Sequence, residues 1–503
     1  MRVSISKNGV HLPAIFLTAG VVLGMVYLAA PWYVFAVSLA TAGIFAVGLF
    51  KPVYAFYLVL LVLVEEMVQY FISYPPYYEI RIYPYYLPLL AGILGVVVLS
   101  VAKKKPLRES PVTSVLWIIV VFDTVSMIWA PHLKIAAWLS VITFLNIALF
   151  YLVLNTVVDE ATLRRTSYIW IFAGVAVATA IILSQWIDVE KTIYLTKGSG
   201  LKMAFQEQVD RPAGLGGVDH VAGYVSMAVF MALGSMAHEK RWKVKAIYFI
   251  LIMYMLFGII LTTSRGVIIG LTSAYLFFIF INPGFRNRFI KYSFIFFVLF
   301  VFTVLVVKPG LIDRMLVGFG YKGKLLFSDK TFTGTEADTS QGQGLSGMEM
   351  REIWWKNGLH EMVKHPYKLL VGLGNGGFVY YSSGGNTVTS PEVNSVSFAF
   401  FYDMGVFGVL LLIILLYLIV KNTYFHLRNA KRDYCYYMLL ASVAALITES
   451  GVHGLVDYDL TSYGSKYFWF PLGFAMAVVN IVKDREKAAD NRAISAEVSD
   501  QGG

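Results

Sequence analysis

The sequence predicts an all-α, polytopic integral membrane protein with about 14 transmembrane helices and a large, partly helical outer loop. Hydrophobic residues make up 58% of the 503 positions and charged residues only 14%, whereas soluble chains carry about 25% charged residues. Apolar runs of roughly 18 or more residues recur along the chain, each long enough to cross a hydrocarbon core. Short clusters of Lys and Arg separate these runs, which is typical of cytoplasmic loops.

Composition also excludes several classes of protein. Long uninterrupted apolar runs satisfy their backbone hydrogen bonds as helices rather than as barrel strands. The net charge of +10 is concentrated between the runs, so it indicates membrane topology and not nucleic-acid binding. The single cysteine, Cys435, excludes an internal disulfide framework and a cysteine-rich metal site. The first apolar run has the length of a full span and no clear processing site, so we expect no cleaved signal.

The predicted spans follow one another closely. They lie at about residues 12–30, 31–50, 52–71, a run ending near 102, 112–130, 134–156, 166–187, 218–237, 245–263, 266–282, 292–309, a run ending near 420, 435–455 and 464–482. Placing every basic cluster in the cytoplasm makes the spans alternate strictly, with both termini cytoplasmic.

The chain then divides into four parts. We expect membrane helices in residues 1–309, an outer (periplasmic or extracellular) loop in 310–393, membrane helices in 394–482 and a cytoplasmic tail in 483–503. The end of the tail is small and polar, which predicts disorder. This topology predicts a multi-pass protein of the inner or plasma membrane.

Two arginines lie at predicted outer helix ends. Arg265 falls between two apolar runs with almost no loop, in the string Thr-Thr-Ser-Arg-Gly. An arginine at that depth either faces a water-filled cavity or a partner, or extends to lipid phosphates. Arg211 begins the string Arg-Pro-Ala-Gly-Leu-Gly-Gly before a helix. Backbone N–H groups there would add to its charge and favour an anion, although a flexible loop would have the same composition.

The outer loop contains a third pattern. Ser346-Gly-Met-Glu349 has the form of a capping box and predicts the start of a helix that carries Arg351. His365-Pro366 predicts its end, because the residue before proline disfavours helix. The string Gly372-Leu-Gly-Asn-Gly-Gly-Phe378 predicts a tight turn.

These motifs, in this order, resemble the O-antigen ligase and O-antigen polymerase family. The resemblance rests on Arg211-Pro-Ala-Gly, Thr-Ser264-Arg265-Gly, Arg351-x-x-Trp354, His365-Pro366, Gly372-x-Gly374-x-Gly376, Asn394-Ser395 followed after nine residues by Gly405-Val-Phe-Gly408, and His453-Gly-Leu-Val-Asp457. It implies transfer of a glycan on the outer face, from an undecaprenyl-diphosphate carrier to a sugar hydroxyl, in lipopolysaccharide or another cell-envelope polysaccharide. The acceptor is lipid A–core for ligases and a lipid-linked glycan for polymerases.

The resemblance also implies a diphosphate site at Arg211, Arg265 and Arg351, without a metal. Guanidinium groups bind phosphate bidentately and neutralise the charge of a diphosphate leaving group. The sequence has no compact Asp/Glu cluster of the kind that binds Mg²⁺, which favours arginine. No cofactor is expected.

One position departs from the family pattern. Asn394 stands where the ligases have a histidine that is proposed to activate the acceptor hydroxyl. An amide does not accept a proton at neutral pH, although it can position a hydroxyl. His365 and His453 are the histidine candidates for a general base, with Glu392 and Asp403 as carboxylate candidates. The departure favours a polymerase over a ligase.

Two alternatives stay open at this point. A flippase or secondary transporter of lipid-linked or anionic substrates would also use arginines in the membrane. Glu65, Glu66 and Asp123 are ionisable residues in predicted spans, and such residues can belong to a proton pathway. A receptor or scaffold without turnover is the third reading.

Overall fold

The computed structural model describes most of the helical core of the chain. The described residues are 32–63, 70–74, 78–82, 85–104, 106–183, 218–262, 264–281, 323–324, 331–332, 347–377, 396–429, 432–448 and 466–501. The spans expected at about 12–30 and 292–309 lie outside these residues, as do Arg211, Asn394 and His453.

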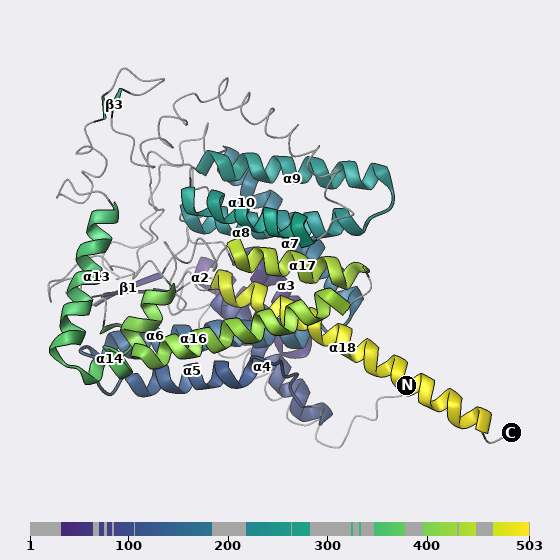
Figure 1. Ribbon diagram of the computed structural model, residues 1–503, viewed down its shortest axis with the longest axis horizontal. Helices are drawn as coiled ribbons and strands as arrows, with labels where there is room; N and C mark the ends of the chain where they lie inside the picture. The colour runs from purple at the N-terminus through teal and green to yellow at the C-terminus, as the bar shows by residue number, and fades with distance from the viewer. Residues whose placement is uncertain are drawn as a thin grey trace.

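The described elements are helices and two short hairpins (Figure 1). The helices are α2 (Trp32–Phe50), α3 (Pro52–Val62), α4 (Tyr86–Lys103), α5 (Thr113–Ser126), α6 (Leu133–Thr156), α7 (Glu160–Leu183), α8 (Val218–His238), α9 (Trp242–Thr262), α10 (Arg265–Ile281), α13 (Gly347–Lys364), α14 (Tyr367–Val371), α16 (Val396–Asn429), α17 (Tyr434–Leu446) and α18 (Lys466–Gln501). The antiparallel strand pairs are β1 (Tyr70–Tyr74) with β2 (Tyr78–Ile82), and β3 (Gly323–Lys324) with β4 (Thr331–Phe332).

Six of the described helices are long and apolar enough to cross a membrane: α4, α6, α7, α8, α9 and α16. Shorter apolar segments occur in α2, α3, α5, α10 and α17. The chain is therefore a predominantly helical, multi-pass membrane protein. In the most apolar 18-residue stretches of α8 and α6, 89% and 72% of the residues are buried. These two helices therefore lie in the interior of the bundle.

Small residues allow the central helices to approach closely. A Cβ at Gly174 of α7 would lie 2.3 Å from the Cβ of Ala228 in α8, and a Cβ at Gly258 of α9 would lie 3.1 Å from Ala178. Membrane helices lack a hydrophobic force between them and associate by such close packing. Aromatic rings fill the remaining core, with the ring centroids of Trp170 and Phe470 4.1 Å apart.

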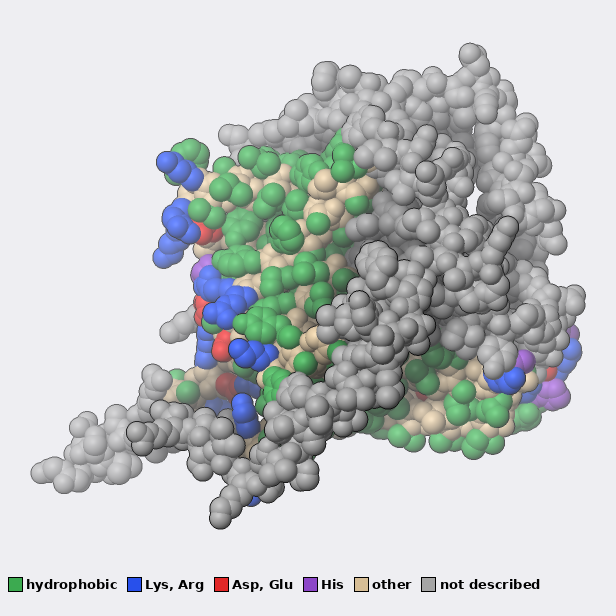
Figure 2. Space-filling view, turned by 180° about the vertical axis from the view of Figure 1, so that it is seen from behind, with side chains coloured by type: hydrophobic (Ala, Val, Ile, Leu, Met, Phe, Trp, Pro, Cys, Tyr) green, Lys and Arg blue, Asp and Glu red, His purple; other side chains and the backbone are tan. Residues whose placement is uncertain are grey.

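Ion pairs join the helix ends at one side of the bundle, which we call the charged end. Arg108 binds Asp484 at 2.9 Å, Arg485 binds Glu160, and Arg164 binds Glu160 at 2.6 Å. These residues adjoin the junctions α4–α5 and α6–α7 and the middle of α18. Figure 2 shows the Lys and Arg side chains gathered along this edge, beside a broad hydrophobic surface. Basic clusters that the sequence analysis assigned to one side of the membrane thus meet at one end of the bundle.

Two expectations from the sequence are wrong. Helix α3 ends at Val62, and Tyr70 pairs with Ile82 in the hairpin β1–β2, so the span expected at about 52–71 does not extend as a helix to residue 71. Aromatic and β-branched residues on both sides of Pro75-Pro76 favour strands, and proline cannot continue a helix. The predicted disorder of the tail is also wrong, because α18 continues to Gln501. Its Ala, Glu, Lys and Arg residues are strong helix formers.

Candidate functional site

The turn between α9 and α10 has the short form that the sequence predicts. α9 ends at Thr262 and α10 begins at Arg265. The carbonyl of Ser264 accepts the N–H of Ile268 at 3.1 Å, so Ser264 directly precedes the first helical turn. Its side chain is buried, and its hydroxyl has no hydrogen-bond partner among the described residues. The first N–H groups of a helix also lack partners within it, which makes this helix start suitable for an anion.

The start of α10 lies close to the chain that leaves α17. A Cβ at Gly270 would lie 2.5 Å from the backbone oxygen of Thr448, so the two backbones touch. Gly270 is about 7.5 Å along the helix axis from Arg265. His453 follows Thr448 by five residues, a length that extends at most about 18 Å. Thr448, the last described residue before His453, therefore lies against α10.

Helix α13 confirms the predicted helix start near residue 346 and the predicted end at His365-Pro366. Figure 1 shows α13 running across the ends of α5, α6 and α16, away from the charged end. It is attached to α16 through Trp355, whose ring centroid is 4.6 Å from that of Phe398 and whose carbonyl accepts the Tyr402 hydroxyl at 2.6 Å. Arg351 precedes Trp355 by four residues, and Asn394 precedes Phe398 by four. The contact therefore joins the helix that carries Arg351 to the start of α16.

The predicted glycine turn is confirmed, and its glycines are required by the backbone. Gly372, Gly374 and Gly376 have φ of 82°, 83° and 72°, in the left-handed region that other residues rarely adopt. The N–H of Leu373 donates to the carbonyl of Tyr402 at 2.6 Å. A Cβ at Gly372 would lie 2.3 Å from the carbonyl oxygen of Asp403. The glycine motif is therefore a close backbone contact with α16.

Gly405 is the matching residue on α16. It interrupts that helix with φ 65° and ψ −155°, and a Cβ there would lie 2.4 Å from the backbone of Leu370. The break in α16 exposes the carbonyls of Tyr402 and Asp403, which accept the N–H groups of Leu373 and Gly374. We call this contact between residues 372–377 and 402–405 the glycine joint.

A buried polar cluster fixes the glycine joint to α5 and α6. The side-chain amide of Asn375 donates to the carboxylate of Asp123 at 2.9 Å and to the hydroxyl of Ser140 at 3.0 Å. Its backbone N–H donates to the hydroxyl of Ser126 at 3.0 Å. Asp123 and Asn375 are each 1% exposed. Asp123 therefore binds the glycine joint directly. The sequence analysis considered Asp123 as part of a proton pathway and did not predict this contact.

His365 lies at the far end of α13 in a charged cluster. Its Nε2 is 3.6 Å from Oε1 of Glu361, and Nζ of Lys368 is 3.3 Å from the same oxygen. Burial opposes ionisation of Glu361, but the hydrogen bond from Lys368 and the charges of Lys364 and His365 outweigh it, so the pKa of this carboxyl lies below its ordinary value. His365 is half exposed, so its imidazole is accessible to solvent or substrate.

The structure describes some of the predicted site positions and leaves others undescribed. The backbone of Arg265 begins α10, and the backbone of Arg351 lies in the first turns of α13. The side chains of both arginines lie outside the described atoms. Glu65, Glu66 and Glu392 are also outside the described residues. Asp403 is buried in the glycine joint. Among the described residues, no group of three or more His, Cys, Asp or Glu could hold a metal ion.

A comparison with known protein families gives a match to the part of the chain that contains the starts of α10 and α13. Residues 250–413 match the family described as O-antigen ligase. The matched region includes Arg265, Arg351, His365 and Asn394, and it excludes Arg211 and His453. No curated protein matches the chain. This match over about a third of the chain confirms the resemblance seen in the motifs.

Proposed function

We propose that this protein transfers a glycan from an undecaprenyl-diphosphate-type lipid to a sugar hydroxyl on the outer face of the membrane. The observation that carries the proposal is the family match over residues 250–413. That region contains both a helix start suited to an anion, at Ser264-Arg265, and the helix that carries Arg351. The family supports glycan transfer as the reaction class and does not favour the flippase or transporter alternative.

The diphosphate would be bound by Arg265, Arg351 and Arg211. The buried Ser264 hydroxyl and the N–H groups at the start of α10 add hydrogen-bond donors beside Arg265. As the glycosidic bond breaks, negative charge grows on the leaving diphosphate. Guanidinium groups fixed by helix ends would stabilise that charge without reorganisation, which is usually the largest catalytic effect. No metal is required by this arrangement.

The acceptor hydroxyl must lose a proton during transfer. His365 is the described histidine among the candidates for the general base, and its Nε2 lies 3.6 Å from Oε1 of Glu361. His453 is the second candidate, since its segment can reach the start of α10. Asn394 would orient the acceptor hydroxyl through its amide and would not accept the proton. We propose that Asn394 lies near Arg351, and the contact between α13 and the start of α16 supports this.

The acceptor is proposed to be a lipid-linked glycan, which makes the protein a polymerase rather than a lipid A–core ligase. Asn394 in place of the ligase histidine supports this choice. The position of the site supports the outer face. Helix α13 and the glycine joint lie away from the charged end (Figure 1), and basic residues favour the cytoplasmic side.

Reconstitution in liposomes with a purified lipid-linked repeat unit tests this proposal. Formation of new glycosidic bonds, measured as longer lipid-linked glycans, is the expected result. Movement of the lipid across the bilayer without bond formation would instead establish a transporter. A gene deletion distinguishes the two enzymes: single repeat units on the surface indicate a lost polymerase, and full chains left on the carrier indicate a lost ligase.

A further inference from the structure

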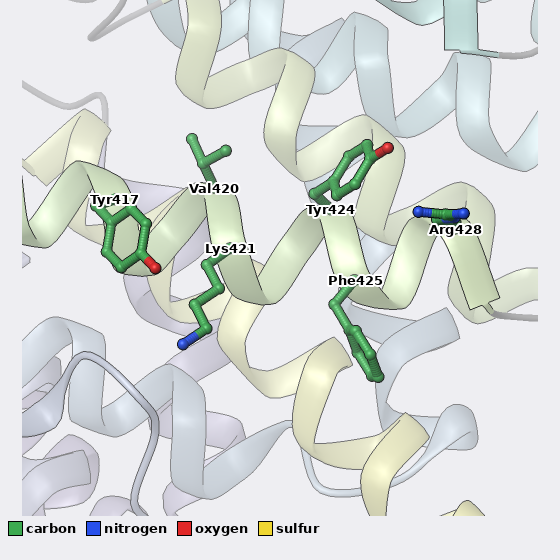
Figure 3. A pocket seen from close by; sticks show the side chains of 6 residues that line it. All are labelled: Tyr417, Val420, Lys421, Tyr424, Phe425 and Arg428. Atoms are coloured by element: carbon green, nitrogen blue, oxygen red, sulfur yellow. The ribbon is translucent and has the colours of Figure 1, made fainter.

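A groove on α16 combines aromatic and basic side chains. It has a volume of about 470 Å³ and is lined by Tyr417, Val420, Lys421, Tyr424, Phe425 and Arg428 (Figure 3). All six residues come from the C-terminal half of α16. Tyr417, Lys421, Tyr424 and Arg428 follow one another at helical spacing, so they form one stripe along the helix. The four apolar or aromatic members are each more than half exposed.

The position of the groove along α16 matches the boundary between hydrocarbon and headgroups. Before it, α16 exposes Leu410, Ile413 and Leu416, a surface suited to acyl chains. After it, the helix reaches the charged end, where Arg485 binds Asp433 at 2.9 Å. Tyrosines are enriched at the level of lipid headgroups, and long basic side chains extend toward that level from membrane helices.

The two cations of the groove lack acidic partners in the described part of the chain. Nζ of Lys421 lies 5.8 Å from the centroid of the Tyr417 ring. Neither Lys421 nor Arg428 forms an ion pair with a described residue. Arg108, Arg164 and Arg485 at the same end all bind carboxylates. The groove therefore carries two positive charges that the described protein does not neutralise, beside apolar walls.

We propose that this groove is a binding site for the headgroup and upper acyl chains of an acidic phospholipid. Lys421 and Arg428 would bind the phosphate and the acidic headgroup, while Tyr417 and Tyr424 would pack against the glycerol and upper acyl chains. A soluble anion would use the two cations and leave the aromatic walls exposed to water or lipid. The charge and the apolar surface together fit one ligand that has both features.

Lipid retention tests the proposal on the full-length protein in nanodiscs of phosphatidylcholine and phosphatidylglycerol. Native mass spectrometry of the released protein measures the phosphatidylglycerol that stays bound. We expect preferential retention by the unmodified protein and a loss of at least about tenfold in Lys421→Gln/Arg428→Gln, because each basic residue near an acidic membrane contributes roughly a fivefold factor. The charge-preserving Lys421→Arg/Arg428→Lys should retain the lipid.

Lys240→Gln/Lys243→Gln is the matched control, since both lysines are exposed near the charged end and lie outside the groove. It should retain phosphatidylglycerol as the unmodified protein does. Equal retention by Lys421→Gln/Arg428→Gln and the control would overturn the proposal. So would full displacement of the lipid by inorganic phosphate, or occupation of the groove by a second copy of the chain.

Discussion

Asn375 donates its side-chain amide to the carboxylate of Asp123 over 2.9 Å, although 252 positions separate the two residues in the chain. This hydrogen bond joins the glycine joint to α5 inside the protein. The glycine joint in turn holds α14 against the start of α16, and α13 packs on the same part of α16. The contact therefore links the buried bundle to the helix that carries Arg351.

Removing the carboxylate should loosen this link. In Asp123→Ala, the buried Asn375 amide loses its acceptor, and a buried donor left unsatisfied costs about 1–3 kcal/mol. Asp123→Asn retains a side-chain oxygen that can accept, so its loss should be smaller. Thermal unfolding in detergent measures both, and Thr124→Ala on the exposed side of the same helix is the control. Equal melting temperatures for Asp123→Ala and the control would contradict this account.

The glycine joint should not tolerate a side chain. Gly372→Ala places a Cβ 2.3 Å from the Asp403 carbonyl oxygen at a φ of 82°, so we expect a loss of more than about 2 kcal/mol and reduced transfer. Gly43→Ala is the matched control, because no atom lies within 4 Å of its Cβ position. That helical substitution should be neutral or stabilising by up to about 1 kcal/mol. A Gly372→Ala protein as stable as Gly43→Ala would show that the joint is not closely packed.

The Glu361 cluster should make the α13–α14 region sensitive to acid. The folded pKa of Glu361 lies below its ordinary value of 4.5, so folding favours the ionised carboxylate. Its contribution to stability is present above pH 4.5 and is lost as the pH falls through the folded pKa. Melting temperatures of the protein and Glu361→Gln should differ at neutral pH and converge in acid. Glu486→Gln, which alters an exposed carboxylate, should show no such convergence.

Local features of the fold could be predicted from the sequence. The bounds of α13 follow from Ser346-Gly-Met-Glu349 and from Pro366, and the positive φ angles follow from the glycine spacing. The hairpin β1–β2 was missed because its aromatic residues also suit a membrane helix. Disorder was expected for the tail because its last residues are small and polar, although its Ala, Glu, Lys and Arg residues have high helix propensity.

Contacts between distant segments could not be predicted. Nothing local relates Asp123 to Asn375, so the buried aspartate suggested a proton pathway when considered alone. The same applies to Glu361 and Lys368, whose ion pair depends on the turn after α13. The resemblance to the family could be seen in the motifs because it depends on residue order. The meeting of Arg211, Arg265 and Arg351 depends on packing and stays a prediction.

The central claim is that Arg265 and Arg351 meet at one diphosphate. In a Cys435→Ser background, the Arg265→Cys/Arg351→Cys pair is treated with a short thiol crosslinker in native membranes. We predict that this cysteine pair forms a crosslink. The Trp355→Cys/Phe398→Cys pair, whose parent rings are in contact, is the positive control. Crosslinking of the control pair without any crosslinking of the arginine pair would contradict the shared site.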